Sequence, residues 1–313
     1  MPFVPSSHFL IVTGKGGVGK TTITAAYAYA LSAQGKRVLV VMCRTKERLS
    51  SMFDSSTIGP DIKRIAPNIW AVNINPEQAL EEYGQKILRA RLFYKWILNN
   101  RHIQKLIKVT PGVQDWSMLG KAWWHTTELH PTGKFKYDVV ILDAPPIGHS
   151  LEMLHVPKII LDVAPHTILT RDAEKAIALF KNPQRCSIVL VALAEEMPVA
   201  ESIEFAQKLS SELGIGIKKL IVNAVLPQLF SDEERRALDC FSTEAFSPNQ
   251  QTILSSLKDR MLREQSQQCL IRSLEKHLLL KARVLPFLFE DTVTFKGTQY
   301  LASKLETQGT LLD

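Results

Sequence analysis

A glycine-rich segment near the amino terminus constrains this chain more than any other feature. It reads Gly14-x-x-x-x-Gly19-Lys20-Thr21, a spacing typical of P-loops that bind phosphate groups. The apolar run at 9–12 before it predicts a buried strand, and the Ala-rich stretch after it, to about residue 33, predicts a helix that ends at Gly35. A strand, a glycine loop and a helix in this order predict a nucleotide-phosphate site.

Each residue type in the loop has a chemical reason to be there. Glycines let successive backbone N–H groups face a phosphate where a side chain would clash, and the start of the helix adds partial positive charge. We expect Lys20 to reach the β- and γ-phosphates and the Thr21 hydroxyl to ligate Mg²⁺. The loop's expected nucleotide-binding residues are Gly14, Lys15, Gly16, Gly17, Val18, Gly19, Lys20, Thr21 and Thr22.

Apolar segments further along the chain predict the rest of the fold. Strands are expected at 37–42, 69–74, 138–142, 186–193, 217–225 and 284–288, and helices at 199–213, 232–238, about 250–280 and the carboxyl terminus. This alternation predicts an α/β fold with a doubly wound, mainly parallel sheet. We expect a single domain over 1–313, with a helical subdomain at about 76–133 on one edge of the sheet.

Cysteine usage and the lack of a long apolar segment indicate where in the cell the protein is found. The chain has four cysteines, and no two form a C-x-x-C pair, which disfavours a disulfide framework and a cysteine-rich zinc site. The amino terminus lacks a charged leader, and no stretch approaches the roughly 18 apolar residues of a membrane span. These features predict a soluble, cytoplasmic protein.

The net charge of +7 is concentrated in one segment. Residues 86–108 contain seven Lys or Arg and no Asp or Glu. Leu88, Leu92 and Trp96 lie four apart and mark one apolar helical face. Two interpretations remain open: a basic surface for an acidic client or an anionic membrane, with the protein peripheral to it, or a core-facing helix with solvated lysines. No nucleic-acid partner is expected.

A second motif follows the strand at 138–142. Asp143 ends this strand, where P-loop proteins place the Asp that holds Mg²⁺ through water, and it opens the run Asp143-Ala-Pro-Pro-Ile-Gly-His149. This run and the loop Gly-Lys-Gly-Gly-Val-Gly-Lys-Thr-Thr at 14–22 resemble the ArsA family of P-loop ATPases, which includes arsenite-pump and tail-anchored-protein-targeting ATPases. The chain is similar to a divergent bacterial-type member, and the resemblance implies the SIMIBI-type P-loop fold.

The resemblance implies ATP and Mg²⁺ as ligands and a dimer, either a homodimer or a heterodimer with a paralogous ATPase. Lys15 is the extra lysine of a deviant Walker A loop and is implied to reach the partner's nucleotide; a solvated loop lysine is the alternative. The implied catalytic residues are Lys15, Lys20 and Asp143. Thr21 and, through water, Asp143 are the implied metal-binding residues.

Three positions outside the loop complete the implied nucleotide site. His149 matches the histidine of the family's second switch. Asn223, in Val222-Asn223-Ala224-Val225, resembles the strand-end asparagine that recognises adenine, and Pro286, in Leu285-Pro286-Phe287, resembles the loop that packs on the base. No N-K-x-D guanine motif is present, so adenine is expected.

The first switch departs from the family pattern S-T-D-P-A-H-x-L-S-D. Leu49 and Ser50 match it, but Arg44 stands where the family has the aspartate that positions the attacking water. A guanidinium has no acceptor, so either Glu47 or another carboxylate takes this role or hydrolysis is slow. Alternatively, Arg44 neutralises phosphate charge, or it is a surface arginine on a drifted loop.

The expected function is a dimeric ATPase in which Mg·ATP binding and hydrolysis drive a conformational switch that binds or releases a client. The C-x-x-C and Met-rich insert of the targeting members are absent, and no cysteine cluster suggests an arsenite site. Two alternatives remain: a regulatory or scaffold subunit that binds ATP without turnover beside a catalytic paralog, and a positioning ATPase similar to MinD or ParA.

Overall fold

A computed structural model describes residues 8–43, 47–75, 79, 113–163, 168–240, 247–290 and 293–312. The basic segment 86–108 and Arg44 lie outside these residues. The described strands form one sheet with the order β3-β4-β2-β5-β1-β6-β7-β8. Their bounds are β1 His8–Gly14, β2 Val38–Cys43, β3 Lys63–Ala66, β4 Ile69–Ile74, β5 Val139–Asp143, β6 Cys186–Leu193, β7 Lys219–Val225 and β8 Ala282–Pro286.

The sheet is parallel except at one edge, where β3 pairs with β4 in the antiparallel direction. Every strand that the sequence predicts is present, with ends displaced by a few residues, and the α/β, doubly wound expectation is confirmed. β3 was not predicted. It has four residues, KRIA, of which only Ile65 is buried, so the apolar run that marks the inner strands is missing.

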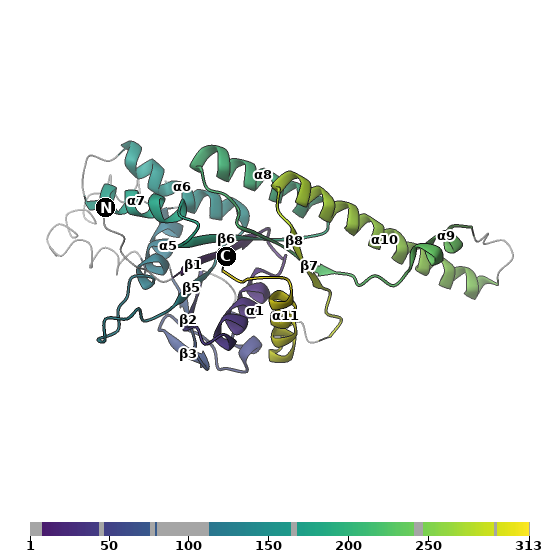
Figure 1. The fold of residues 1–313 in the computed structure, drawn as a ribbon, viewed down its shortest axis with the longest axis horizontal. Helices are drawn as coiled ribbons and strands as arrows, with labels where there is room; N and C mark the ends of the chain where they lie inside the picture. Colours follow the sequence, from purple (N-terminus) through teal and green to yellow (C-terminus); the bar gives the residue numbers. More distant parts are fainter. Residues whose placement is uncertain are drawn as a thin grey trace.

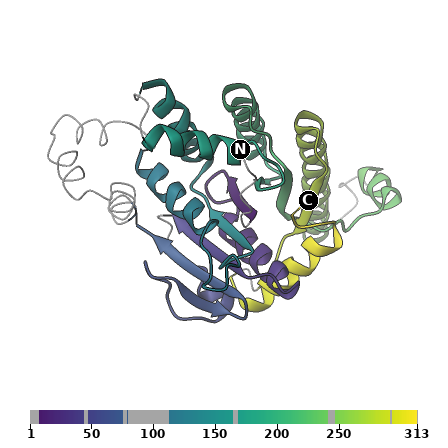
Figure 2. The same ribbon diagram turned by 60° about the vertical axis from the view of Figure 1, so that its left-hand side comes forward.

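Helices cover both faces of the sheet (Figures 1 and 2). α1 and α11 lie on one face, and α5, α6, α7 and α8 lie on the other. The helix bounds are α1 Lys20–Ala33, α5 Val113–His125, α6 Ile147–Val163, α7 Ile168–Phe180, α8 Glu196–Leu213, α9 Asp232–Cys240, α10 Pro248–Leu278 and α11 Phe295–Thr307, with a 3-10 turn at Ser51–Phe53.

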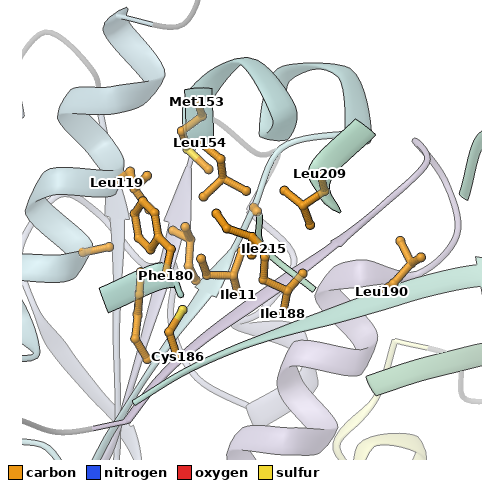
Figure 3. Packing of buried hydrophobic residues seen from close by; sticks show 14 of the residues in the cluster. Ile11, Leu119, Met153, Leu154, Phe180, Cys186, Ile188, Leu190, Leu209 and Ile215 are labelled. Atoms are coloured by element: carbon orange, nitrogen blue, oxygen red, sulfur yellow. The ribbon is translucent and has the colours of Figure 1, made fainter. Parts of the chain in front are cut away.

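Alternate residues of β1 belong to two separate cores. Phe9 and Ile11 join the cluster under α5 to α8, whereas Leu10 and Val12 join the cluster under α1 and α11, and all four are fully buried. Figure 3 shows the first cluster, including Ile11 from β1 beneath Leu154 of α6. Burial on both faces explains why the strands next to the phosphate loop are continuous apolar runs.

The predicted end of the first helix is confirmed. Gly35 has a φ of 79°, a left-handed conformation that costs glycine little. The Lys36 N–H donates to the Leu31 carbonyl over 3.1 Å, as in a Schellman C-cap. Gly35 therefore stops α1 before β2.

The longest helix, α10, has 31 residues and extends beyond the sheet, with α9 near its far end (Figure 1). A buried carboxylate fastens this arm. Glu264 is 3% exposed and accepts hydrogen bonds from Arg260 Nε at 3.0 Å, Arg235 at 3.3 Å and the Leu229 N–H at 3.1 Å. Glu264 thereby joins α9, α10 and the loop that follows β7.

Only part of the expected helical subdomain at 76–133 falls within the described residues. α5 carries Trp116, Trp123 and Trp124, and Trp116 is buried in the cluster under α5 to α8. The single-domain boundaries and the subdomain stay predictions. Among the described residues, no helix combines the length and apolar character required to cross a membrane.

Candidate nucleotide site

The glycine loop connects β1 to α1 at the centre of the sheet. A Cβ on Gly14 would lie 2.1 Å from the Val191 carbonyl oxygen, so packing against β6 excludes any side chain there. Gly17 and Gly19 have φ values of 86° and 91°. Gly19 is the N-cap of α1 and has no side chain, so the helix begins with a glycine loop of the kind that binds anions.

Lys20, the first residue of α1, folds back across the loop. Its Nζ donates to the carbonyl oxygens of Gly14 at 3.2 Å and Lys15 at 3.1 Å. Burial lowers the pKa of Lys20, and the nearby Asp143 carboxylate opposes that shift. An ammonium has three donors, and the two carbonyls account for two of them, so one can reach a phosphate oxygen.

Thr21 and Asp143 are brought together as the sequence predicted. β5 pairs with β1, so Asp143 at its carboxyl end lies beside the loop, and the Thr21 hydroxyl donates to Asp143 Oδ2 at 2.6 Å. Asp143 is fully buried, and this burial raises its pKa to about 6, although the Thr21 hydrogen bond and the Lys20 charge act the other way.

The other Asp143 oxygen, Oδ1, is buried without a hydrogen-bond partner in the described part of the chain. A buried polar atom without a partner is costly. Here it lies on the carboxylate whose other oxygen accepts from the Thr21 hydroxyl, and carboxylate, hydroxyl and water oxygens are the ligands that Mg²⁺ prefers. The Thr21–Asp143 pair therefore fits the expected metal.

The segment after Asp143 is tied to the neighbouring strand. The Thr13 hydroxyl donates to Ser150 Oγ at 2.9 Å, and Ser150 Oγ donates to the Pro145 carbonyl at 2.7 Å. His149 lies beside this buried pair in the first turn of α6, but its side chain is 65% exposed and its Nδ1 is 3.7 Å from Glu152. A switch role for His149 stays a prediction.

The second loop lysine has a partner that the sequence did not suggest. Lys15 Nζ is 2.7 Å from the Glu201 carboxylate on α8, and the two side chains are 27% and 40% exposed. This ion pair lies within one chain. In this structure the Lys15 ammonium therefore binds Glu201, whereas the resemblance implies that it contacts a partner's nucleotide.

Asn223 and Pro286 lie at adjacent strand ends, in β7 and β8, where Val225 pairs with Pro286. Asn223 Nδ2 donates to the Val18 carbonyl of the glycine loop at 3.0 Å. After Pro286, the Phe287 and Phe289 rings form an exposed edge-to-face pair with centroids 5.0 Å apart. The structure thus places Asn223 beside the loop and Pro286 at the neighbouring strand end, and recognition of the base by these residues stays a prediction.

Glu47, one candidate for the acceptor missing from the first switch, is engaged elsewhere. Its Oε1 accepts from the Ser50 N–H at 2.8 Å, and its Oε2 accepts from the Ser50 hydroxyl at 2.7 Å. Both oxygens therefore stabilise the turn before the Ser51–Phe53 helix. To orient a water, Glu47 must first leave this turn.

Comparison with known proteins places the chain in a family. The chain matches the family model of the anion-transporting ATPases over residues 7–171 and 164–268. It is 31% identical to ATPase BagA of Mycobacterium tuberculosis over 229 residues, 69% of this chain and 65% of that protein. It is 28% identical to an arsenical pump-driving ATPase of Escherichia coli over 247 residues, 70% of this chain and 40% of that protein.

A relative from Acidiphilium multivorum, also named an arsenical pump-driving ATPase, is 26% identical over 263 residues, 75% of this chain and 42% of that protein. In each comparison the match spans less than two thirds of the relative's length. The family match nevertheless covers most of the chain, including the glycine loop, Asp143 and Asn223. With the phosphate loop and the Thr21–Asp143 pair in place, the chain belongs to the ArsA family of anion-transporting ATPases.

Proposed function

We propose that this protein binds Mg·ATP in the glycine loop and hydrolyses it as a dimeric switch that binds or releases a client. One observation carries the proposal. The Thr21 hydroxyl and the buried Asp143 carboxylate meet at 2.6 Å beside the start of α1, and Asp143 Oδ1 has no partner among the described residues. Such an arrangement favours a metal-bound phosphate over a purely structural contact.

Different residues of the chain bind the phosphate groups and the metal. Backbone N–H groups of the loop and the start of α1 hold phosphate oxygens, and Lys20 adds an ammonium already held over the loop by two carbonyls. Thr21 and, through water, Asp143 would hold Mg²⁺, which when bound would supply positive charge against the phosphate oxygens.

We propose a dimer because the family resemblance implies that Lys15 contacts the nucleotide of a second subunit. To do so, Lys15 must release the Glu201 carboxylate and bind a phosphate in its place. Because this ion pair is partly exposed, breaking it costs little, about 1 kcal/mol or less. Lys15 is therefore available to a phosphate brought by a second subunit.

Turnover by this subunit alone is proposed to be slow. Hydrolysis needs an acceptor that orients water in line with the γ-phosphate. Arg44 has no acceptor, and both Glu47 oxygens bond to Ser50. A partner that contains the missing aspartate would raise the rate in a mixed dimer.

Phosphate release by the purified protein tests this function, with Lys20→Ala as the control for contaminating activity. We expect slow release by wild type, none above background by Lys20→Ala, and faster release by Arg44→Asp. If wild type binds ATP but neither it nor Arg44→Asp releases phosphate, the ATP-binding scaffold is the better description. Brisk wild-type release that Arg44→Ala leaves unchanged would refute the role given to Arg44.

A further inference from the structure

The side chain of Asn223 contacts the phosphate loop itself. Its Nδ2 donates to the Val18 carbonyl at 3.0 Å, and a Cβ on Gly19 would lie 2.4 Å from the same nitrogen. Val18 is 1% exposed, so its carbonyl has little access to water. The Asn223 amide is thus packed against the turn between Val18 and Gly19, directly before Lys20.

The backbone around Asn223 has an irregular conformation that aims this side chain. Ala224 has a φ of 54°, a left-handed conformation that costs a residue with a Cβ. The register between β7 and β8 shifts between Val222 and Val225, which bracket Asn223 and Ala224. Bulges of this kind change the direction in which a side chain points, and strain of this kind persists where the surroundings fix it.

We propose that Asn223 is a positioning residue for the phosphate loop: its amide holds the Val18–Gly19 turn in the shape that binds phosphate, whatever base the ligand carries. This inference rests on the proposed nucleotide site and adds a second task to a residue that the resemblance assigns to the base. Because Val18 precedes the Gly19 N-cap, the hydrogen bond acts on the N–H groups at the start of α1.

If Asn223 positions the loop, its loss should weaken the binding of a ligand that has phosphates but no base. Removing the Asn223 amide leaves the buried Val18 carbonyl without its donor and lets the turn move. The loss of one such hydrogen bond corresponds to about a fivefold loss of affinity. Asn223→Leu is the variant of choice because leucine is similar in size, neutral and unable to donate. Its binding of Mg·ATP and of Mg·tripolyphosphate is compared with wild type by calorimetry.

We expect tripolyphosphate affinity to fall about fivefold in Asn223→Leu, with ATP falling at least as far. Pro286→Ala is the matched control on the base side: it should weaken ATP and leave tripolyphosphate unchanged. In the ligand-free protein, amide hydrogen exchange of residues 14–20 should rise in Asn223→Leu and not in Pro286→Ala. A residue that only reads the base would leave that exchange unchanged.

Ala224 supplies a pair of variants that keeps the test decisive if Asn223→Leu folds poorly. Ala224→Gly retains the left-handed conformation and should keep wild-type affinity for tripolyphosphate. Ala224→Val disfavours that conformation, moves the Asn223 amide and should reproduce the loss.

An unchanged tripolyphosphate affinity in Asn223→Leu, or unchanged exchange of the loop in a variant that has lost affinity, would overturn the inference. If wild type bound neither ligand, the proposed nucleotide function would fail instead, and loop exchange would still decide the role of Asn223.

Discussion

Replacing Asp143 by asparagine should make the ligand-free protein more stable and abolish its use of Mg²⁺. Asp143 is fully buried, and desolvation raises the pKa of its carboxyl group from 3.8 to about 6. Asparagine is nearly isosteric and keeps an oxygen that can accept the Thr21 hydroxyl, at 2.6 Å in wild type. The substitution therefore removes the buried charge and retains the local packing.

The size and sign of the effect follow from proton linkage. The folded state binds the Asp143 proton more tightly than the unfolded state, so the free energy of unfolding falls as pH rises from about 4 to about 6. Above pH 6 the buried carboxylate costs the folded state its full penalty, about 3 kcal/mol for a shift of this size. Asparagine does not titrate, so its advantage is largest at pH 7, about half as large at pH 5 and small near pH 4.

Urea unfolding in EDTA, at pH values from 5 to 8, measures this advantage directly, and a thermal midpoint about 5 °C higher at pH 7 would accompany it. Calorimetry with Mg·ATP should show that the stabilised variant has lost the metal-dependent part of its affinity. An Asp143→Asn protein no more stable than wild type at pH 7, or a stability difference that does not change with pH, would contradict a destabilising buried charge at Asp143.

Two further substitutions test other contacts of the described residues. Glu201→Gln removes the partner of Lys15 and should change the free energy of unfolding by less than about 1 kcal/mol, because the pair is partly exposed; ATP-dependent dimerisation in sedimentation velocity should increase, and a decrease would show that Glu201 assists the dimer. Glu264→Ala leaves two arginines without their buried carboxylate and should cost about 3–5 kcal/mol in urea unfolding. Glu204→Ala, which removes an exposed partner of Lys208, is its control and should cost under about 1 kcal/mol; equal losses would contradict the importance of burial.

The sequence was sufficient for the part of the site that is local. The glycine spacing, the apolar strand before it and the Ala-rich helix after it depend only on neighbouring residues, and the structure places all three as predicted. Asp143 was found in the same way, because an apolar strand that ends in an acidic residue is a pattern within one segment. Parallel pairing of β5 with β1 then brings it to Thr21.

Contacts between distant segments could not be predicted. Lys15 and Glu201 are 186 positions apart, and Asn223 and Val18 are 205 apart. No repeating pattern in the sequence connects the residues of either pair. A surface glutamate of α8 cannot be identified as the partner of Lys15 before the fold is known. The left-handed Ala224 was equally hidden, since sequence rules expect glycine or asparagine at a positive φ.

Two kinds of element were also missed. The antiparallel edge strand β3 is short and mostly polar, and its pairing with β4 is interrupted by a register shift. No helix was predicted over 147–163, where α6 contains Pro157 in its interior, a residue that normally marks a helix end.

The most direct test that the glycine loop binds Mg·ATP is calorimetric titration of ATP into wild type and Lys20→Ala, each with and without Mg²⁺. Lys20 is the residue expected to bind the β- and γ-phosphates, and a charged hydrogen bond of this kind corresponds to at least about a tenfold change in affinity. We expect tight binding by wild type only with Mg²⁺ and at least about tenfold weaker binding by Lys20→Ala. Equal affinity of the two proteins for ATP would contradict the assignment of this loop as the nucleotide site.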